Sequence, residues 1–186
     1  FFKLNPRVDD IPDTYSRRIG PIRLLVLGGI RKGGDGCLCP ATALLKALLI
    51  HVVLGREEAL IMDMEAGVEH LGRGTTRTVE ALLVVTEPTV KSVDAAAQIA
   101  KLARDLGITR IFGVVNKALD GRGEAFLSRL STLGITPLGI LPFDPAVQEA
   151  EEAGSPVFDL PGAERTRAGI RAIASALEER LGPFGG

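Results

Sequence analysis

The sequence has few cysteines, little net charge and no long apolar run. Its 186 residues include two cysteines and carry a formal net charge of −1, with the charged side chains dispersed along the chain. No apolar stretch approaches the ~20 residues of a membrane span, and no basic cluster offers a contact for nucleic acid or an anionic membrane. We therefore expect no nucleic-acid and no membrane partner. The scarcity of cysteine, without a signal peptide, indicates a reducing, cytoplasmic location.

The sequence also lacks a phosphate-binding loop of the form G-x-x-x-x-G-K-[ST]. The nearest imitation is KGGDG at residues 32–36, within a glycine-rich stretch at residues 28–40. A phosphate loop continues with a lysine for the β- and γ-phosphates and a hydroxyl for magnesium. Cys37 and Leu38 stand in those two places. The stretch therefore has two interpretations, a phosphate-binding loop and a metal site with thiolate ligands.

The metal interpretation rests on Cys37 and Cys39, which form a C-x-C pair shortly after Arg31 and Lys32. Nearby cations and the start of an expected helix favour thiolate over thiol. Thiolates suit zinc, copper(I) or nickel. A tetrahedral structural site needs four ligands, so two copies of the chain meeting at this pair would complete one. The alternatives are a pair of small hydrophobic residues or a redox pair.

Short apolar runs alternate with stretches of helical spacing along the chain. This alternation is typical of an α/β fold with a parallel, doubly wound sheet. At 186 residues we expect a single domain spanning residues 1–186, which opens with a loop at 1–20 that contains a short strand at 1–4. The expected strands are 22–27, 59–62, 81–86, 111–115 and 137–141, and the expected helices are 41–54, 90–106, 123–133, 145–153 and 163–181.

In doubly wound sheets ligands bind beyond the carboxyl ends of the strands, so residues just after the expected strands mark a candidate site. We expect these residues to converge on one edge of the sheet: 28–39, 63–74, 87–88, 116–117 and 142–144. Asp63 closes the strand at 59–62, which we expect to be buried, and Gly67 follows in a D-x-x-x-G pattern. A carboxylate there can hold magnesium, and the glycine N–H can sense a terminal phosphate. An ordinary turn at a strand end is the alternative.

The ends of the last two expected strands suit a nucleotide base. The residues concerned are Asn116, Lys117, Pro142, Phe143 and Asp144. In the N-K-x-D motif of GTPases the aspartate reads guanine, but Leu119 stands at that position. An asparagine side chain can still pair with the edge of adenine, and a Pro-Phe-Asp segment can flank the ring. Together the two loops predict an adenine pocket.

Five stretches together carry a family resemblance: KGGDGCLCP, ALIMDMEAGVEHLGRGT, VVTEPTVKSVDAA, VVNK and ILPFD. In this combination the chain resembles, nearly end to end, the CooC-type accessory ATPases that mature nickel carbon monoxide dehydrogenase. These belong to the deviant Walker ATPases, together with MinD and the nitrogenase iron protein. The resemblance implies a P-loop NTPase fold that forms a homodimer around bound ATP and Mg²⁺.

By the same resemblance, Cys37 and Cys39 match the family's C-x-C pair, which binds Ni²⁺ or Zn²⁺ between subunits. Asp63 and Gly67 match its magnesium and γ-phosphate switch, and Asn116 with residues 142–144 matches its adenine contacts. The resemblance leaves open whether nickel or zinc is the working metal.

The chain departs from the family at its amino terminus, because the family's phosphate loop lies upstream of the position of Phe1. We therefore expect an N-terminally truncated fold, a parent protein that hydrolyses ATP, and background turnover by this chain alone. The leading hypothesis is an ATP-dependent metallochaperone that inserts nickel into carbon monoxide dehydrogenase. The alternatives are a MinD- or ParA-like positioning ATPase and a non-catalytic metal-binding scaffold.

Overall fold

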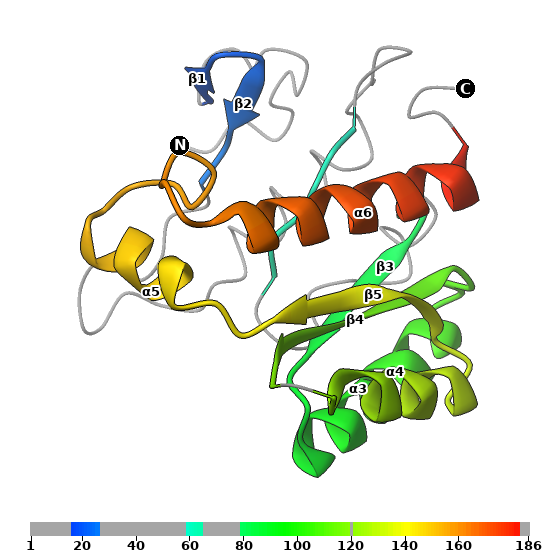
Figure 1. Cartoon of the computed structure of the whole chain (residues 1–186). Helices are drawn as coiled ribbons and strands as arrows, with labels where there is room; N and C mark the ends of the chain where they lie inside the picture. Colours follow the sequence, from blue (N-terminus) through cyan, green and yellow to red (C-terminus); the bar gives the residue numbers. More distant parts are fainter. Residues whose placement is uncertain (1–15, 27–58, 65–78, 120, 183–186) are drawn as a thin grey trace, which may run out of the picture.

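The computed structural model describes residues 16–26, 59–64, 79–119 and 121–182 of the chain. Figure 1 shows a layered α/β arrangement in these residues, with helices on both faces of a three-stranded sheet. This layering confirms the predicted doubly wound fold.

The sheet contains three parallel strands, β3 (Leu82–Thr86), β4 (Ile111–Ala118) and β5 (Thr136–Pro142), in that order. Helices α3 (Val90–Asp105) and α4 (Gly123–Thr132) connect successive strands and lie together on one face. The opposite face carries α6 (Glu164–Leu181), which contacts β5. The shorter helix α5 (Pro145–Glu152) begins just beyond the carboxyl end of β5.

The core lies between the sheet and the α3–α4 layer. Ala96, Ala100 and Ala103 of α3 share one helical face and are each at most 1% exposed, so small side chains allow close approach to the strands. At Gly113 in β4, an added Cβ would lie 2.8 Å from Ile135 Cγ2 and 3.0 Å from Leu130 Cδ1. A glycine is therefore required where the α4 layer presses on the middle strand.

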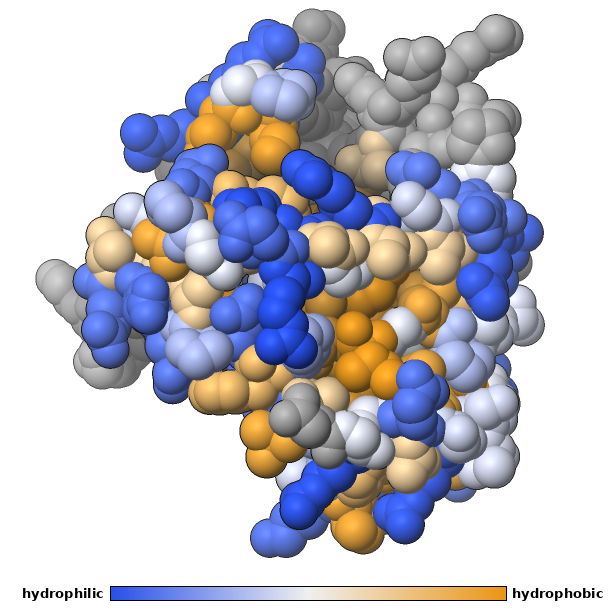
Figure 2. Space-filling model, in the orientation of Figure 1, coloured by the Kyte–Doolittle hydropathy of each residue, from blue (hydrophilic) through white to orange (hydrophobic). Residues whose placement is uncertain are grey.

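The strand predicted at 22–27 is wrong in its partner and its burial. Ile22–Leu24 forms β2, which pairs antiparallel with β1 (Arg17–Ile19) in a separate two-stranded sheet. Every residue of both strands is exposed, and Figure 2 shows apolar side chains gathered around this hairpin. The hairpin closes locally through Gly20, whose φ of +58° suits the first position of a two-residue turn. β2 therefore pairs with its neighbour in sequence, whereas a parallel partner was expected. The sequence pattern did not predict β1, because two of its three residues are arginines.

The buried strand predicted at 59–62 is also wrong. Residues 59–64 adopt no regular structure, and Ile61 is 90% exposed. Met62 and Met64 nevertheless pack against the core cluster, while Asp63 between them is exposed. This alternation is that of a strand, but the segment has no ladder of hydrogen bonds to a neighbour within the described residues.

The later elements confirm the remaining predictions to within a few residues. β3, β4 and β5, and helices α3 to α6, begin and end close to their predicted bounds, with β4 extending three residues further than expected. The predicted strand at 1–4 and helix at 41–54 lie outside the described residues. Among the helices that the structure describes, none has the length and apolar character needed to cross a membrane.

Candidate functional site

The carboxyl edge of the sheet is distorted in β4. Asn116 and Lys117, two residues predicted to bind the nucleotide, lie at this distortion. Val115 pairs with Ile140 and Ala118 pairs with Pro142, so Asn116 and Lys117 together oppose a single residue of β5. Two residues opposite one is the pattern of a β-bulge, which re-aims side chains and is frequent next to functional sites. Lys117 has a φ of 53°, the one positive value at a non-glycine residue in the described parts of the chain.

The bulge fixes the side chain of Asn116. The Lys117 backbone N–H donates to Asn116 Oδ1 at 2.9 Å, and Asn116 is half-buried. Only the amide oxygen can accept this bond, so a flipped amide would set two donors against each other. The left-handed backbone of Lys117 costs about 1–3 kcal/mol, and it persists because the strand pairs on both sides hold it.

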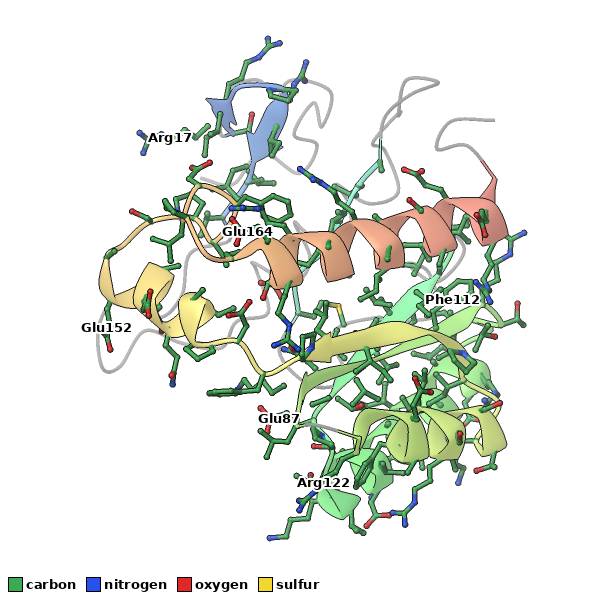
Figure 3. The ribbon with its side chains drawn as sticks, in the orientation of Figure 1. Arg17, Glu87, Phe112, Arg122, Glu152 and Glu164 are labelled. Atoms are coloured by element: carbon green, nitrogen blue, oxygen red, sulfur yellow. The ribbon has the colours of Figure 1, made fainter. Side chains whose placement is uncertain are left out.

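The side chain of Lys117 reaches the end of the neighbouring strand. Its Nζ lies 2.7 Å from Glu87 Oε1, and the bond to Glu87 raises the pKa of Lys117 above its ordinary value. Glu87 directly follows β3, and its carbonyl accepts the N–H of Thr89, the residue that caps α3. Figure 3 shows Glu87 at this edge and Phe112 toward the opposite end of the sheet. The ion pair therefore bridges the carboxyl ends of β3 and β4.

The end of β5 joins the same cluster. The Phe143 N–H donates to the carbonyl of Ala118 at 2.9 Å, which brings the segment after β5 beside the end of β4. Phe143 is 41% exposed and Leu119 is 54% exposed. An exposed aromatic ring beside an oriented amide can stack on a planar heterocycle while the amide pairs with its edge.

Asp144, directly after β5 and its neighbour Phe143, links this edge of the sheet to helices α5 and α6. Its Oδ1 accepts the N–H of Ala146 at 3.1 Å and so caps α5, and its Oδ2 accepts the hydroxyl of Thr166 in α6 at 2.6 Å. The bond from Thr166 is the main cause that lowers the pKa of Asp144 below its ordinary value. The structure thus gives Asp144 a structural role, and its contact with a base remains a prediction.

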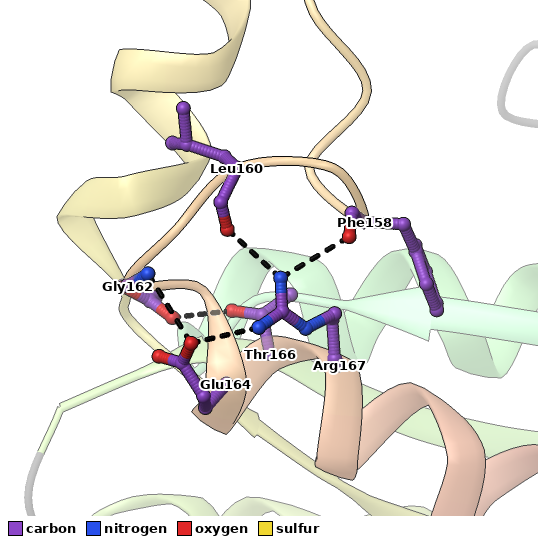
Figure 4. A network of polar contacts seen from close by, with 7 residues as sticks. Phe158, Leu160, Gly162, Glu164, Thr166 and Arg167 are labelled. Carbon is purple, nitrogen blue, oxygen red and sulfur yellow. Dashed lines mark hydrogen bonds and ion pairs between the residues drawn. The ribbon is translucent and has the colours of Figure 1, made fainter.

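Hydrogen bonds from Arg167, the residue after Thr166, hold the loop between α5 and α6 in place. Arg167 donates to the carbonyls of Phe158 at 3.1 Å and Leu160 at 2.8 Å, and to Glu164 Oε1 at 2.8 Å. Glu164 also accepts the N–H of Gly162. Figure 4 shows this network at the start of α6. It fixes the position of Thr166, and through it that of Asp144.

Replacing Thr166 by valine should reduce stability in a pH-dependent way. The folded pKa of Asp144 is depressed, so its contribution is complete above the unfolded pKa of about 3.9 and is lost as pH falls through the folded pKa. The variant should have a lower urea midpoint than the wild type at pH 7, and the difference should shrink below about pH 4. Thr166→Ser keeps the hydroxyl and should track the wild type. A difference that stays constant from pH 7 to pH 3 would contradict the role of this bond.

The structure therefore brings five of the predicted site residues to one edge. Asn116, Lys117, Pro142, Phe143 and Asp144 lie at the ends of β4 and β5. Asp63 is exposed and shares no hydrogen bond or ion pair with another described residue, so no polar contact within the described parts of the chain links it to this edge.

Three predicted residues, Cys37, Cys39 and Gly67, lie outside the described residues. Within the described parts of the chain no cluster of metal-ligating side chains occurs. Glu87, directly after the strand expected at 81–86, was among the residues expected to meet at this edge, and it forms an ion pair with Lys117. Sequence reasoning missed Thr166, which lies 22 residues from Asp144 and gave no signal.

Comparison with known proteins places these observations in context. No protein-family model matches the chain. It is 45% identical over 186 residues to the carbon monoxide dehydrogenase accessory protein CooC of Rhodospirillum rubrum, covering all of this chain and 69% of that protein. It is 46% identical over 157 residues to an uncharacterized ATP-binding protein of Methanocaldococcus jannaschii, covering 84% of this chain and 61% of that protein.

The fold is similar to the crystal structure of the cell division ATPase MinD of Pyrococcus furiosus. The TM-score is 0.52 at 20% identity, and the match covers 63% of this chain and 50% of that one. This likeness shows the fold, a parallel α/β sheet with helices on both faces, and nothing beyond it.

Proposed function

Because this chain belongs to the CooC family of carbon monoxide dehydrogenase accessory proteins, we propose that it acts in the ATP-dependent insertion of nickel during maturation of that enzyme. One observation carries the proposal: the 45% identity extends over all 186 residues. These residues include the C-x-C pair and the strand-end cluster, by which we mean Asn116, Lys117, Pro142, Phe143 and Asp144. The likeness to MinD rests on fold alone, so it supports no positioning function.

The strand-end cluster would hold the adenine of ATP. Asn116 offers a fixed amide for the base edge, Lys117 lies next to it, and Phe143 offers an exposed ring between Pro142 and Asp144. This edge is where ligands bind in doubly wound sheets. Asp63 and Gly67 would serve the magnesium ion and the terminal phosphate. The carboxylate of Asp63 is exposed and engaged by no other described residue, which fits a group that binds a hydrated cation.

The cargo metal would be bound by thiolates shared between two chains. Cys37 and Cys39 from each of two copies supply four sulfur ligands, the number that a closed tetrahedral site requires, for Ni²⁺ or Zn²⁺. ATP would favour the closed homodimer and hydrolysis would open it, because a ligand shifts an equilibrium only by binding one state better. The partner that receives the nickel would be carbon monoxide dehydrogenase.

A chimera tests this function. Residues 1–186 replace the matching residues of the Rhodospirillum rubrum protein, in cells from which that protein has been removed. We expect the chimera to restore carbon monoxide oxidation per unit of dehydrogenase protein in nickel-limited medium. The same chimera with Cys37→Ser and Cys39→Ser should restore none. Failure of the unsubstituted chimera, at an abundance equal to that of the native protein, would contradict the proposed function.

A further inference from the structure

We infer that the hairpin of β1 and β2 is a docking element that enters a groove, with one apolar and one acidic wall, on the enzyme that receives the metal. The inference rests on the proposed function, because that function requires such an enzyme to meet this chain. All residues of the two strands are exposed. No third strand joins this small sheet within the described parts of the chain, so both of its faces are open to a partner.

The pairing register gives the hairpin two faces of different chemistry. Its cross-strand pairs are Arg17 with Leu24, Arg18 with Arg23, and Ile19 with Ile22. Side chains alternate across a strand, so the first and third pairs share one face and the middle pair lies on the other. Ile19, Ile22 and Leu24 are 52%, 63% and 45% exposed, which makes the first face largely apolar. The second face presents two guanidinium groups opposite each other.

The composition of the hairpin is typical of a surface that binds another protein. Residues 16–26 contain three arginines and no acidic residue, although the whole chain carries a net charge of −1. Arginine is enriched at protein interfaces, and exposed apolar patches rimmed by polar groups mark interaction sites. Arg18 and Arg23 repel each other across the strand pair, because like charges directly opposite are destabilising. Carboxylates of a partner would relieve this repulsion, and each can accept two hydrogen bonds from a guanidinium.

The charge of the hairpin decides among the possible occupants. A symmetric pair of chains brings the same patch together from both sides, so two hairpins facing each other would set arginine against arginine. An anionic membrane attracts clusters of about four to eight basic residues, whereas the hairpin has three. A protein groove that presents carboxylates opposite an apolar wall complements both faces of the hairpin.

The test measures binding of the chimera described above to nickel-free carbon monoxide dehydrogenase of Rhodospirillum rubrum by biolayer interferometry. Arg18→Gln/Arg23→Gln should lower the association rate constant about tenfold, because complementary charges steer the encounter of two proteins. Raising the salt concentration should slow association of the unsubstituted chimera far more than that of the variant. Arg171→Gln/Arg180→Gln removes the same charge from exposed positions of α6. This control should change the rate constant less than about twofold, because salt screens charges far from the contact.

A second variant tests the apolar face separately. Ile22→Thr keeps a β-branched residue in the strand and exchanges a methylene and methyl group for a hydroxyl. It should raise the dissociation rate constant about fivefold, because most effects of interface substitutions act on dissociation, and it should leave the salt dependence unchanged. The substituted hairpin positions are exposed, so the urea midpoints of both hairpin variants should match that of the unsubstituted chimera.

Unchanged association of Arg18→Gln/Arg23→Gln, with the unsubstituted chimera still binding the dehydrogenase, would overturn the inference and leave the proposed function intact. An equal loss in the α6 variant would also overturn it, because the effect would then be one of net charge. Arginine-dependent binding to vesicles of phosphatidylserine and phosphatidylcholine would assign the hairpin to a membrane, and arginine-dependent self-association would assign it to a contact between copies. Either result would overturn the inference.

Two further outcomes separate the inference from the proposed function. A chimera that restored carbon monoxide oxidation without measurable binding to the dehydrogenase would overturn the inference alone. A chimera that neither bound the dehydrogenase nor restored oxidation would overturn both.

Discussion

Replacing Asp63 by asparagine in the chimera is expected to slow ATP hydrolysis by about 100-fold, the scale on which one preorganised electrostatic contact to a transition state acts. The proposed role of Asp63 is to hold the hydrated magnesium ion beside the terminal phosphates. An asparagine keeps the size of the side chain but removes the negative charge that attracts the cation. Turnover is measured as phosphate release at saturating ATP and Mg²⁺.

The same substitution should leave stability almost unchanged. Asp63 is exposed and forms no hydrogen bond or ion pair with another described residue, and surface substitutions of this kind usually change stability by less than about 0.5 kcal/mol. Asp94→Asn, at an exposed position of α3, is the matched control and should alter neither quantity. Unchanged turnover together with a large fall in the urea midpoint would make Asp63 a structural residue and remove it from the magnesium site.

Replacing Leu130 by alanine should lower the free energy of unfolding by about 2–5 kcal/mol, the range found for truncated core leucines. Leu130 of α4 is 0% exposed and packs beside Gly113 at the middle of the sheet. The close fit there leaves little room for neighbours to collapse into the cavity. The free energy is measured by urea unfolding of the chain.

Leu102→Ala is the matched control, because Leu102 lies on α3 and is 42% exposed. It should cost clearly less than Leu130→Ala, about 1–1.5 kcal/mol, since a large part of its side chain stays in water in the folded chain. Equal losses in the two variants would show that the α4 layer does not form the core described above.

The sequence predicts the fold from residue 81 onward well, whereas the two earlier predicted strands that the structure describes are wrong, for a physical reason. From residue 81 onward the strands have helical partners close in sequence, because α3 packs on β3, α4 on β4 and α6 on β5. The periodicity of one short stretch therefore suffices to predict each element. The runs at 22–27 and 59–62 are apolar enough for buried strands, but burial needs neighbouring strands that a local pattern cannot supply. Ile22–Leu24 pairs with β1, its neighbour in sequence. Residues 59–64 form no strand, and only their last four residues alternate between exposed and half-buried as a strand would.

The sequence predicted that the candidate residues at the ends of β4 and β5 would lie at one edge of the sheet, but not how they contact one another. Asn116 and Phe143 follow from the rule that strand ends carry ligands. The bulge in β4, the left-handed backbone at Lys117 and the bond between Asp144 and Thr166 depend on register and tertiary packing. No spacing in the sequence encodes them. Asp144 shows the difference, because a residue chosen for a base contact proved to cap α5 and fasten α6.

Titration of the purified protein tests most directly whether two chains share one metal ion through Cys37 and Cys39, as proposed above. Ni²⁺ and Zn²⁺ are titrated separately into the wild-type chain and the Cys37→Ser/Cys39→Ser variant under reducing conditions, with bound metal measured after equilibrium dialysis. We expect one metal ion per two chains in the wild type and an affinity at least about 100-fold weaker in the variant, because a serine hydroxyl stays protonated and replaces a soft thiolate. Equal stoichiometry and affinity in the two proteins would contradict the claim.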